Sequence, residues 1–210
     1  MIVENYINIS KTSKMPCKSF ALPVSKNTCI GMLDEHGKIK EVCQNCYAMK
    51  GSYSWRSAKA LRKHNYEETL NNLDSFHDDM INLIKREKSN YFRWFDSGDI
   101  YDNDLLYTIT SICRLTPDIF HWIPTKAREL LDQDLWEKLE ALPNVKVRYS
   151  SPSVNGYYES THGSTVIQNG QKIDKSKVYV CPVGKDKDRK SCQECRACWH
   201  DDKVIAYTYH

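Results

Sequence analysis

Eight of the nine cysteines in this 210-residue chain fall into two groups near its opposite ends. The first group contains Cys17, Cys29, Cys43 and Cys46. The second group contains Cys181, Cys192, Cys195 and Cys198. Four thiolates are enough for one tetrahedral zinc ion or one four-iron cluster. The sequence therefore predicts a metal site in each group, whereas Cys113 lies apart in a helical pattern and is expected to be a small buried apolar residue.

Disulfide bridges are the alternative for these cysteines, and the start of the chain argues against them. Residues 1–5 have neither the basic start nor the apolar run of a secretory signal, so we expect a reducing, cytoplasmic compartment. In that compartment C-x2-C spacings are more often metal or redox sites than bridges. The soft thiolate ligands and the compact Cys192-x2-Cys195-x2-Cys198 spacing favour an iron-sulfur cluster, with zinc as the alternative metal.

The composition allows one sizeable hydrophobic core. Hydrophobic residues make up 40% of the chain, and we predict a core domain over 1–165 followed by a cysteine-rich extension over 166–210. No stretch approaches the roughly 18 apolar residues that a membrane-spanning helix needs, so no membrane partner is expected. The net charge of +3, from 30 basic and 27 acidic residues, does not by itself indicate a nucleic-acid partner.

Strand and helix patterns alternate after the first cysteine group. Helices are predicted over 55–73, 74–88, 102–115 and 128–142, and strands over 5–9, 91–95, 119–123 and 145–149. The segment 15–51 is predicted to be a long loop, which metal binding would order. This alternation is typical of a parallel sheet wound with helices.

Polar segments follow three of the predicted strands. They are Ser97-Gly98-Asp99, Pro124-Thr125-Lys126 and Ser150-Ser151-Pro152-Ser153. Each segment alone is equally typical of an ordinary turn or helix start. Binding groups of parallel sheets gather at the carboxyl ends of the strands, so three such segments beside a cysteine loop favour a site for a small molecule. The residues predicted to line it are Ser97, Gly98, Asp99, Thr125 and Ser151.

Charged residues outside these segments have two interpretations. Arg93 alternates with Trp94 and is predicted to point into the interior, where it needs a ligand or an acidic partner such as Asp96. The basic run from Trp55 to His64 is most often a solvated helix face, although it also suits contact with phosphates.

Four separated motifs resemble the phage gene product 88 family. They are Thr28-Cys29, Cys43-Gln-Asn-Cys46-Tyr47-Ala48, the segment FRWFDSGDIY at 92–101, and Ser191-Cys192-x2-Cys195-x2-Cys198-Trp199. They occur in the family's order and span most of the chain, from about Met15 to Trp199. The resemblance implies a phage or prophage origin, and hence the cytoplasm of the host cell.

The cysteine loop and the later Ser97-Gly98-Asp99 are also similar to the radical S-adenosylmethionine (radical SAM) architecture, a partial (βα) barrel. That resemblance implies that three cysteines hold a [4Fe-4S] cluster and leave one iron open for S-adenosylmethionine; they would be Cys29, Cys43 and Cys46. It also implies that Ser97-Gly98-Asp99 contacts the methionyl amine, with Asp99 as the acceptor. The chain departs from the usual pattern by its C-x13-C-x2-C spacing in place of C-x3-C-x2-C, and because Tyr47 follows the last cysteine instead of preceding it.

Two functions are consistent with these patterns. The first is a radical SAM-like enzyme that acts on an unknown substrate and carries an auxiliary metal site at the C-terminal cysteines. The alternative is a non-catalytic protein, stapled by zinc or iron-sulfur sites, that binds nucleic acid or a phage or host partner. Cys17 separates the two: if it joins the first group, that site is closed, and if it does not, one metal position stays open.

Overall fold

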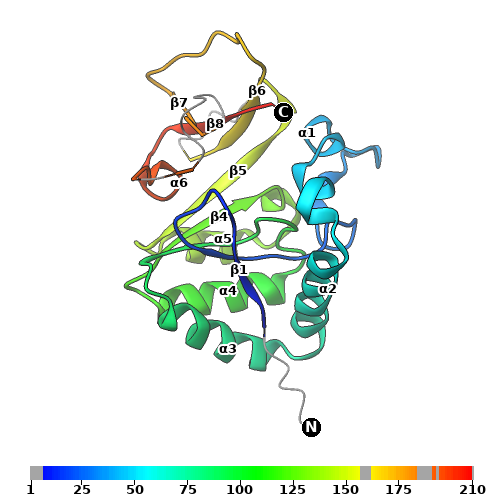
Figure 1. The fold of residues 1–210 in the computed structure, drawn as a ribbon, viewed down its shortest axis with the longest axis vertical. Coiled ribbons are helices and arrows are strands. Elements are labelled where there is room, and N and C mark those ends of the chain that lie inside the picture. Colours follow the sequence, from blue (N-terminus) through cyan, green and yellow to red (C-terminus); the bar gives the residue numbers. More distant parts are fainter. Residues whose placement is uncertain (1–6, 157–161, 184–190, 193, 210) are drawn as a thin grey trace.

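An eight-stranded sheet runs through the molecule (Figure 1). The structure, a computed structural model, describes residues 7–156, 162–183, 191–192 and 194–209. The strands lie in the order β1-β2-β3-β4-β5-β6-β8-β7, and each neighbouring pair is parallel except β1 with β2. Their bounds are β1 Ile9–Lys11, β2 Lys18–Phe20, β3 Tyr91–Arg93, β4 Phe120–Thr125, β5 Val145–Val154, β6 Ser164–Ile167, β7 Val178–Val180 and β8 Val204–Thr208.

Helices connect β2, β3, β4 and β5 in the alternating pattern that the sequence predicted. The α-helices are α1 Glu41–Gln44, α2 Arg56–Asn71, α3 Leu73–Arg86, α4 Asn103–Leu115, α5 Gln133–Glu140 and α6 Ala197–His200. The 3-10 helices are η1 Ile30–Met32, η2 Tyr47–Met49, η3 Gly51–Ser54 and η4 Arg128–Leu130. The predicted helix over 128–142 is split into η4 and α5, because the carboxylate of Asp132 caps a new helix by accepting hydrogen bonds from the N–H groups of Asp134 (2.8 Å) and Leu135 (3.3 Å).

The mixed α/β fold is thus confirmed, and a closed barrel is not formed. Among the described strands, β1 and β7 are the two edges of the sheet and do not pair with each other. β6, β8 and β7 continue the sheet and carry a small core of their own, made by Ile167, Val178, Val204 and Ala206. The predicted boundary at 165 falls within β6, and the division into two domains stays a prediction. In the described part of the chain, no helix is long and apolar enough to cross a membrane.

Alternation along β3 divides its side chains between two layers. Phe92 and, just beyond the strand, Trp94 are buried in the main core with residues of α3 and α4. Cys113 of α4 is fully buried in the same core, which confirms its predicted role. Arg93 lies on the other face, with its guanidinium 4.5 Å from the ring centre of Trp122 in β4.

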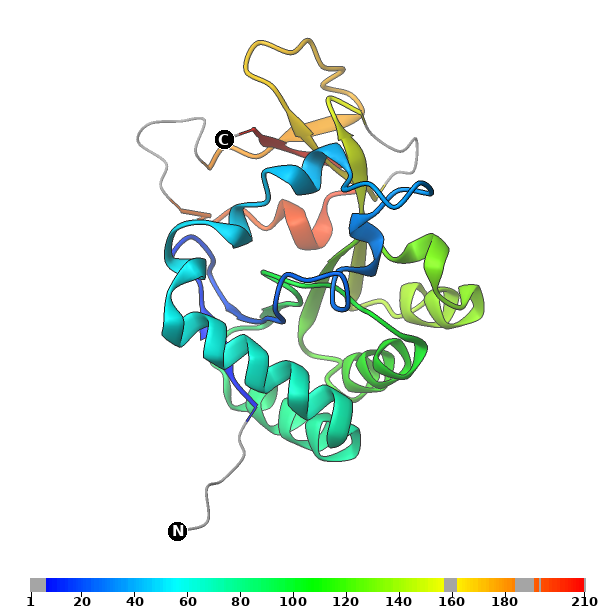
Figure 2. The same ribbon diagram turned by 90° about the vertical axis from the view of Figure 1, so that its right-hand side faces the viewer.

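The C-terminal segment around α6 covers that second face, opposite α4 and α5 (Figure 2). Trp199 of α6 donates its indole N–H to the carbonyl of Phe92 at 3.0 Å. Arg148 of β5 is fully buried and donates to four carbonyl oxygens of the segment, at 2.6 to 3.0 Å. These acceptors belong to Ala197, Cys198, Asp201 and Lys203. Arg148 therefore fastens the C-terminal segment to the sheet.

Three strands differ from their predicted positions. The predicted strand over 5–9 lies partly outside the described residues, and β1 begins at Ile9. β2 interrupts the predicted loop over 15–51, since three residues are too few to show an alternating pattern. β5 continues to Val154, so Ser151 lies within a strand instead of in the predicted loop after it. The strand continues because it changes partner, pairing with β4 up to Tyr149 and with β6 from Ser150.

His121 of β4 should make the fold sensitive to acid. Its Nδ1 accepts a hydrogen bond from the indole N–H of Trp94 (3.2 Å), and its Nε2 bonds the hydroxyl of Thr116 (2.9 Å), which donates to the carbonyl of Ile112. This pattern assigns the proton to Nε2. Burial lowers the pKa of His121 from its ordinary 6.5 to about 3.

Below pH 6.5 the unfolded chain therefore binds a proton that the folded chain excludes. The free energy of unfolding then decreases as the pH is lowered, by up to about 1.4 kcal/mol per pH unit. We expect His121→Gln, which keeps one acceptor and one donor, to flatten the dependence between pH 6.5 and 4.5. Urea unfolding of both proteins at several pH values measures this. Parallel curves over that range would show that His121 is not the sensitive group.

Candidate metal centres

Three cysteines of the N-terminal group lie together, and Cys17 is not among them. Burial is the main cause that raises the pKa of Cys29 and of Cys43. Cys43 and Cys46 add smaller increases at Cys29, and Cys46 adds one at Cys43, so the three thiols are near enough to interact. All three are free thiols. The predicted group of four is thus replaced by a group of three, which we call the N-terminal trio.

Backbone contacts seat this cysteine loop on the carboxyl edge of the sheet. The N–H of Asp99, in the turn after β3, donates to the carbonyl of Thr28 at 2.8 Å. Gly31 of η1 lies against the turn after β4, where a Cβ atom would stand 2.2 Å from the carbonyl oxygen of Lys126. A side chain at Gly31 would therefore collide with backbone. The loop that carries Cys29 is held between two strand ends.

The other two cysteines of the trio come from α1 and the turn after it. Cys43 lies in α1, and the carboxylate of Glu41 in the same helix accepts the N–H of Val154 at the end of β5 (2.9 Å). The N–H of Cys46 donates to the carbonyl of Cys43 at 3.3 Å, which closes the C-x2-C turn. β5 thus supports the part of the loop that the sheet edge does not reach.

Asp99 is the buried acid beside the trio. Its side chain accepts hydrogen bonds from the N–H groups of Ile100 and Lys126, each at 2.8 Å, and from the hydroxyl of Thr125. Burial raises its pKa to about 6, against the opposing effect of these donors. Its charge in turn raises the pKa of Cys29. The predicted acceptor therefore lies next to the predicted metal ligands.

Replacing Asp99 by asparagine should be costly, because both carboxylate oxygens accept a backbone N–H. An amide would turn its NH2 group toward one of these donors, and leaving a buried donor without an acceptor costs about 1–3 kcal/mol. We expect that loss in urea unfolding at pH 7. Asp102→Asn is the matched control, because Asp102 caps α4 through one acceptor oxygen and asparagine caps as well as aspartate. Equal effects of the two substitutions would contradict this account of Asp99.

Thr125 and Lys126 complete the edge next to Asp99. The buried hydroxyl of Thr125 accepts the N–H of Ala127 at 2.9 Å besides bonding Asp99. The ammonium charge of Lys126 lowers the pKa of both Asp99 and Cys43, so this lysine lies close to both. Lys126 was not among the predicted site residues, although its place directly after Thr125 at a strand end was a signal.

The other predicted site residues serve the backbone. The hydroxyl of Ser97 donates to the carbonyl of Leu22 at 2.7 Å. Gly98 has φ +78, and a Cβ there would lie 2.5 Å from the Cβ of Leu22, so this turn requires glycine. The buried hydroxyl of Ser151 donates to the carbonyl of Ser153 at 3.0 Å. These contacts give Ser97, Gly98 and Ser151 roles in holding the backbone, and their part in binding a small molecule stays a prediction.

Cys17 lies at the opposite end of β2 from the trio. It directly precedes the strand and so lies toward the amino ends of the parallel strands, whereas the Cys29 loop follows their carboxyl ends. Its side chain is 4% exposed and packs with Trp122 and Trp199. The N–H of Arg93 bonds its sulfur.

The cysteines of the C-terminal group lie around Cys17. Cys192 raises the pKa of Cys17, and is itself affected by Cys181 and Cys195. Cys181 also raises the pKa of Cys198, which packs in the same cluster as Cys17. The structure thus gathers five thiols here, which we call the C-terminal quintet. The excursion over 184–190 lies outside the described residues.

The buried thiols are protonated at neutral pH. Burial raises the pKa of Cys17, Cys29 and Cys198 to about 12, and that of Cys43 and Cys192 above the usual value. Only the thiolate binds a metal. Metal binding at either place must therefore release protons and weaken as the pH falls.

The spacing of the donor side chains bears on which kind of metal centre could bind. Within the described residues, no three His, Cys, Asp or Glu side chains are close enough to hold a single metal ion. A four-iron cluster is wider than one ion, so its cysteine sulfurs stand farther apart than those of a tetrahedral zinc site, whose Zn–S bonds are about 2.3 Å. Thiolate ligands favour soft metals or iron-sulfur clusters, and the metal at each place stays a prediction.

A chain of hydrogen bonds links Arg93 to the loop behind Cys46. The sequence predicted Asp96 as the direct partner of Arg93. The structure instead has the guanidinium donating to the hydroxyl of Tyr47 (2.9 Å), which donates to the backbone carbonyl of Asp96 (2.6 Å). The carboxylate of Asp96 accepts from the hydroxyl of Tyr53 at 2.9 Å. The two tyrosines were missed, although Tyr47 directly follows a predicted ligand.

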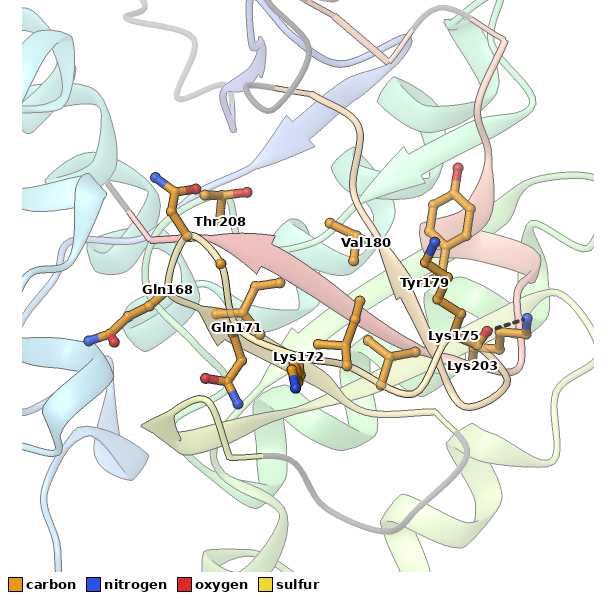
Figure 3. Close-up of a pocket in the computed structure, with 13 residues that line it drawn as sticks. Gln168, Gln171, Lys172, Lys175, Tyr179, Val180, Lys203 and Thr208 are labelled. Atoms are coloured by element: carbon orange, nitrogen blue, oxygen red, sulfur yellow. Dashed lines mark hydrogen bonds between the residues drawn. The ribbon is translucent and has the colours of Figure 1, made fainter.

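A cavity of about 700 Å³ lies among β6, β7, β8 and the turn at 168–175 (Figure 3). Lys172, Lys175 and Lys203 make its lining basic, and Lys203 donates to the carbonyl of Lys175 at 3.0 Å. Tyr179 also lines it, and the hydroxyl of Tyr179 is 3.5 Å from the sulfur of Cys195. None of the predicted small-molecule residues lines this cavity.

Comparison with known families tests the resemblance to the phage gene product 88 family. The model of the family described as Gene product 88 matches residues 3–201. The chain belongs to that family. The Gene product 88 match includes all eight clustered cysteines and confirms the phage family that the four motifs indicated. No curated protein and no solved structure matches the chain, and the similarity to radical SAM proteins gains no support from these comparisons.

Proposed function

We propose that this protein is a radical SAM-like iron-sulfur enzyme whose [4Fe-4S] cluster is held by Cys29, Cys43 and Cys46. The observation that carries the proposal is the separation of Cys17 from the trio, which leaves three thiols at the carboxyl edge of a parallel sheet. Three protein ligands and one open position are typical of catalytic metal sites, whereas structural sites are closed. The C-terminal quintet would hold the auxiliary metal, with zinc as the alternative to iron.

The residues around the trio have roles that follow from their contacts. The cluster, when bound, would supply one electron to S-adenosylmethionine at its open iron. Asp99 is the acceptor for the methionyl amine, because a carboxylate offers about four acceptor positions and the N–H groups of Ile100 and Lys126 and the hydroxyl of Thr125 occupy three of them. Lys126 offers a positive charge to the methionyl carboxylate or to the thiolates. Ser97, Gly98, Thr125 and Ser151 act as positioning residues.

The first test is the composition of protein purified without oxygen. We expect iron and acid-labile sulfide, and an electron spin resonance spectrum of the reduced protein that changes when S-adenosylmethionine is added. Iron and sulfide with an unchanged spectrum would remove the open position from the proposal. Stoichiometric zinc without sulfide would overturn the enzyme function altogether.

A pair of variants assigns the cluster to the trio. Cys43→Ala is expected to abolish the spectral response to S-adenosylmethionine, because two thiols cannot replace three. Cys17→Ala is the matched control, and it should keep that response. An equal loss of the spectral response in both variants would contradict the proposal of an open iron position.

The second candidate function is a non-catalytic binding protein with structural zinc sites. The exposed basic and aromatic side chains at the start of α2 favour it. Trp55, just before the helix, is 66% exposed, and Arg56, Lys59 and Lys63 are exposed beside it. Arg62 of the same basic run is buried and donates to the carbonyls of Tyr53 and Ala58, so it is structural. Binding of fluorescent single-stranded DNA and RNA should then weaken in a Trp55→Ala, Lys59→Ala variant. Unchanged binding would exclude this surface.

A further inference from the structure

We propose that Cys17 is a ligand of the C-terminal metal site, so that one metal centre joins the segment before β2 to the end of the chain. The sequence pairs Cys17 with Cys29, because only eleven residues separate them, but the fold places Cys17 directly before β2 and Cys29 in the loop that follows the carboxyl end of that strand. The inference extends the auxiliary site of the proposed function, yet it does not depend on the cluster at the trio.

Backbone and side-chain contacts already bring the two segments together. The N–H of Cys192 donates to the carbonyl of Lys14 at 2.9 Å. The thiol of Cys192 is 3.9 Å from the sulfur of Met15. These contacts place the loop that ends in Cys17 beside the first cysteine of the C-x2-C-x2-C run. No change of fold is needed for Cys17 to reach that site.

The thiols of Cys17, Cys181, Cys192 and Cys198 are arranged around one another. Cys192 interacts with both Cys17 and Cys181, and Cys181 interacts with Cys198. Cys198 packs against the cluster that contains Cys17, Trp122 and Trp199. A four-iron centre binds four thiolates, and these four cysteines supply that number. A single tetrahedral ion would require the sulfurs to approach one another more closely, because no three side chains of the described residues are close enough to hold one ion.

The surroundings of Cys17 differ from those of an ordinary buried cysteine. Cys113 is also fully buried, and its polar neighbour is the indole of Trp94. Cys17 instead lies near the positive charges of Arg93 and Arg196, and its sulfur accepts the N–H of Arg93. Cys17 therefore has charged neighbours from β3 and from the C-terminal cysteine run, which the surroundings of Cys113 lack among the described residues.

Cobalt binding can test the assignment without the trio. In a background with Cys29, Cys43 and Cys46 changed to serine, titration with Co²⁺ should give thiolate-to-metal charge-transfer absorption from the C-terminal site. We expect Cys17→Ser in this background to weaken Co²⁺ affinity at least tenfold, or to lower that absorption per bound ion by about a quarter, one thiolate in four. Cys113→Ser is the matched control and should change neither quantity. An unchanged affinity and absorption in Cys17→Ser would overturn the proposal.

A measurement on the unsubstituted chain covers the case in which Cys17→Ser folds poorly. Saturating Co²⁺ should slow the alkylation of Cys17 together with that of Cys192, as mapped by mass spectrometry of the peptides. Protection of Cys192 with unchanged labelling of Cys17 would overturn the proposal. Neither result depends on iron or on S-adenosylmethionine, so failure of the proposed enzyme function would be recognised separately.

Discussion

Replacement of Arg148 by methionine is expected to lower the free energy of unfolding by about 3–5 kcal/mol. The guanidinium is fully buried and supplies hydrogen bonds to four carbonyl oxygens of the segment at 197–203. Methionine fills a similar volume but donates nothing, so these carbonyls would lose buried donors that water cannot easily replace. Urea unfolding at pH 7 measures the loss.

Lys146→Met is the matched control for this prediction. Lys146 lies on the same strand and also reaches the C-terminal segment, through one ion pair with Asp202 at 2.9 Å. The carboxylate of Asp202 is largely exposed, and such pairs contribute roughly 0–1 kcal/mol. Comparing Arg148→Met with Lys146→Met therefore distinguishes the stability contributed by a buried side chain with several hydrogen bonds from that of a surface ion pair.

Loss of Arg148 should also release the segment it fastens. We expect limited proteolysis to cut Arg148→Met within 191–209 at protease concentrations that leave Lys146→Met intact. A destabilised protein without increased cleavage there would mean that Arg148 supports the sheet itself and not the docking of α6.

Much of the fold could be predicted because its signals are local. The helical pattern around Met80 and the caps at Asp102 and Asp132 place helices through residues that are neighbours in the chain. β2 and the long β5 could not be predicted in the same way. Their extent depends on which strand lies beside them, and Ser151 belongs to a strand because β6 pairs there.

The sequence could predict which residue types form the candidate site, but not which of the cysteines lie together. The spacing of Cys43 and Cys46 lies within one turn, so their proximity follows from sequence alone. The partner of Cys17 depends on the direction of β2, which places Cys17 before the strand and Cys29 in the loop after it. The need for glycine at position 31 could not be predicted from the sequence either, because it depends on contact with Lys126, which is distant in the chain.

Gly31→Ala is expected to displace the cysteine loop from the sheet edge. The new Cβ would stand 2.2 Å from the carbonyl oxygen of Lys126 and 2.5 Å from its carbonyl carbon. Both are backbone atoms, so no change of rotamer relieves the collision, and the loop has to move. Overpacking of this kind costs about 1–3 kcal/mol, and more when backbone is involved.

The displaced loop should also lose its cofactor chemistry. Cys29 lies two residues before Gly31, and a shift of its thiol relative to Cys43 and Cys46 would separate the three ligands. We expect the response of the reduced protein to S-adenosylmethionine to disappear and its iron content to fall, with the auxiliary site unaffected.

Gly37→Ala distinguishes this effect from a general cost of replacing glycine in the loop. Gly37 has φ +73, and an added Cβ would have nothing within 4 Å, so the substitution should cost only the roughly 1–2 kcal/mol of a left-handed backbone. Its iron content should match that of the unsubstituted chain. The opposite result is a Gly31→Ala variant that keeps both its iron and its response to S-adenosylmethionine. That result would show that the contact with Lys126 is not needed to hold the trio, and that the contacts of α1 with β5 position the three cysteines.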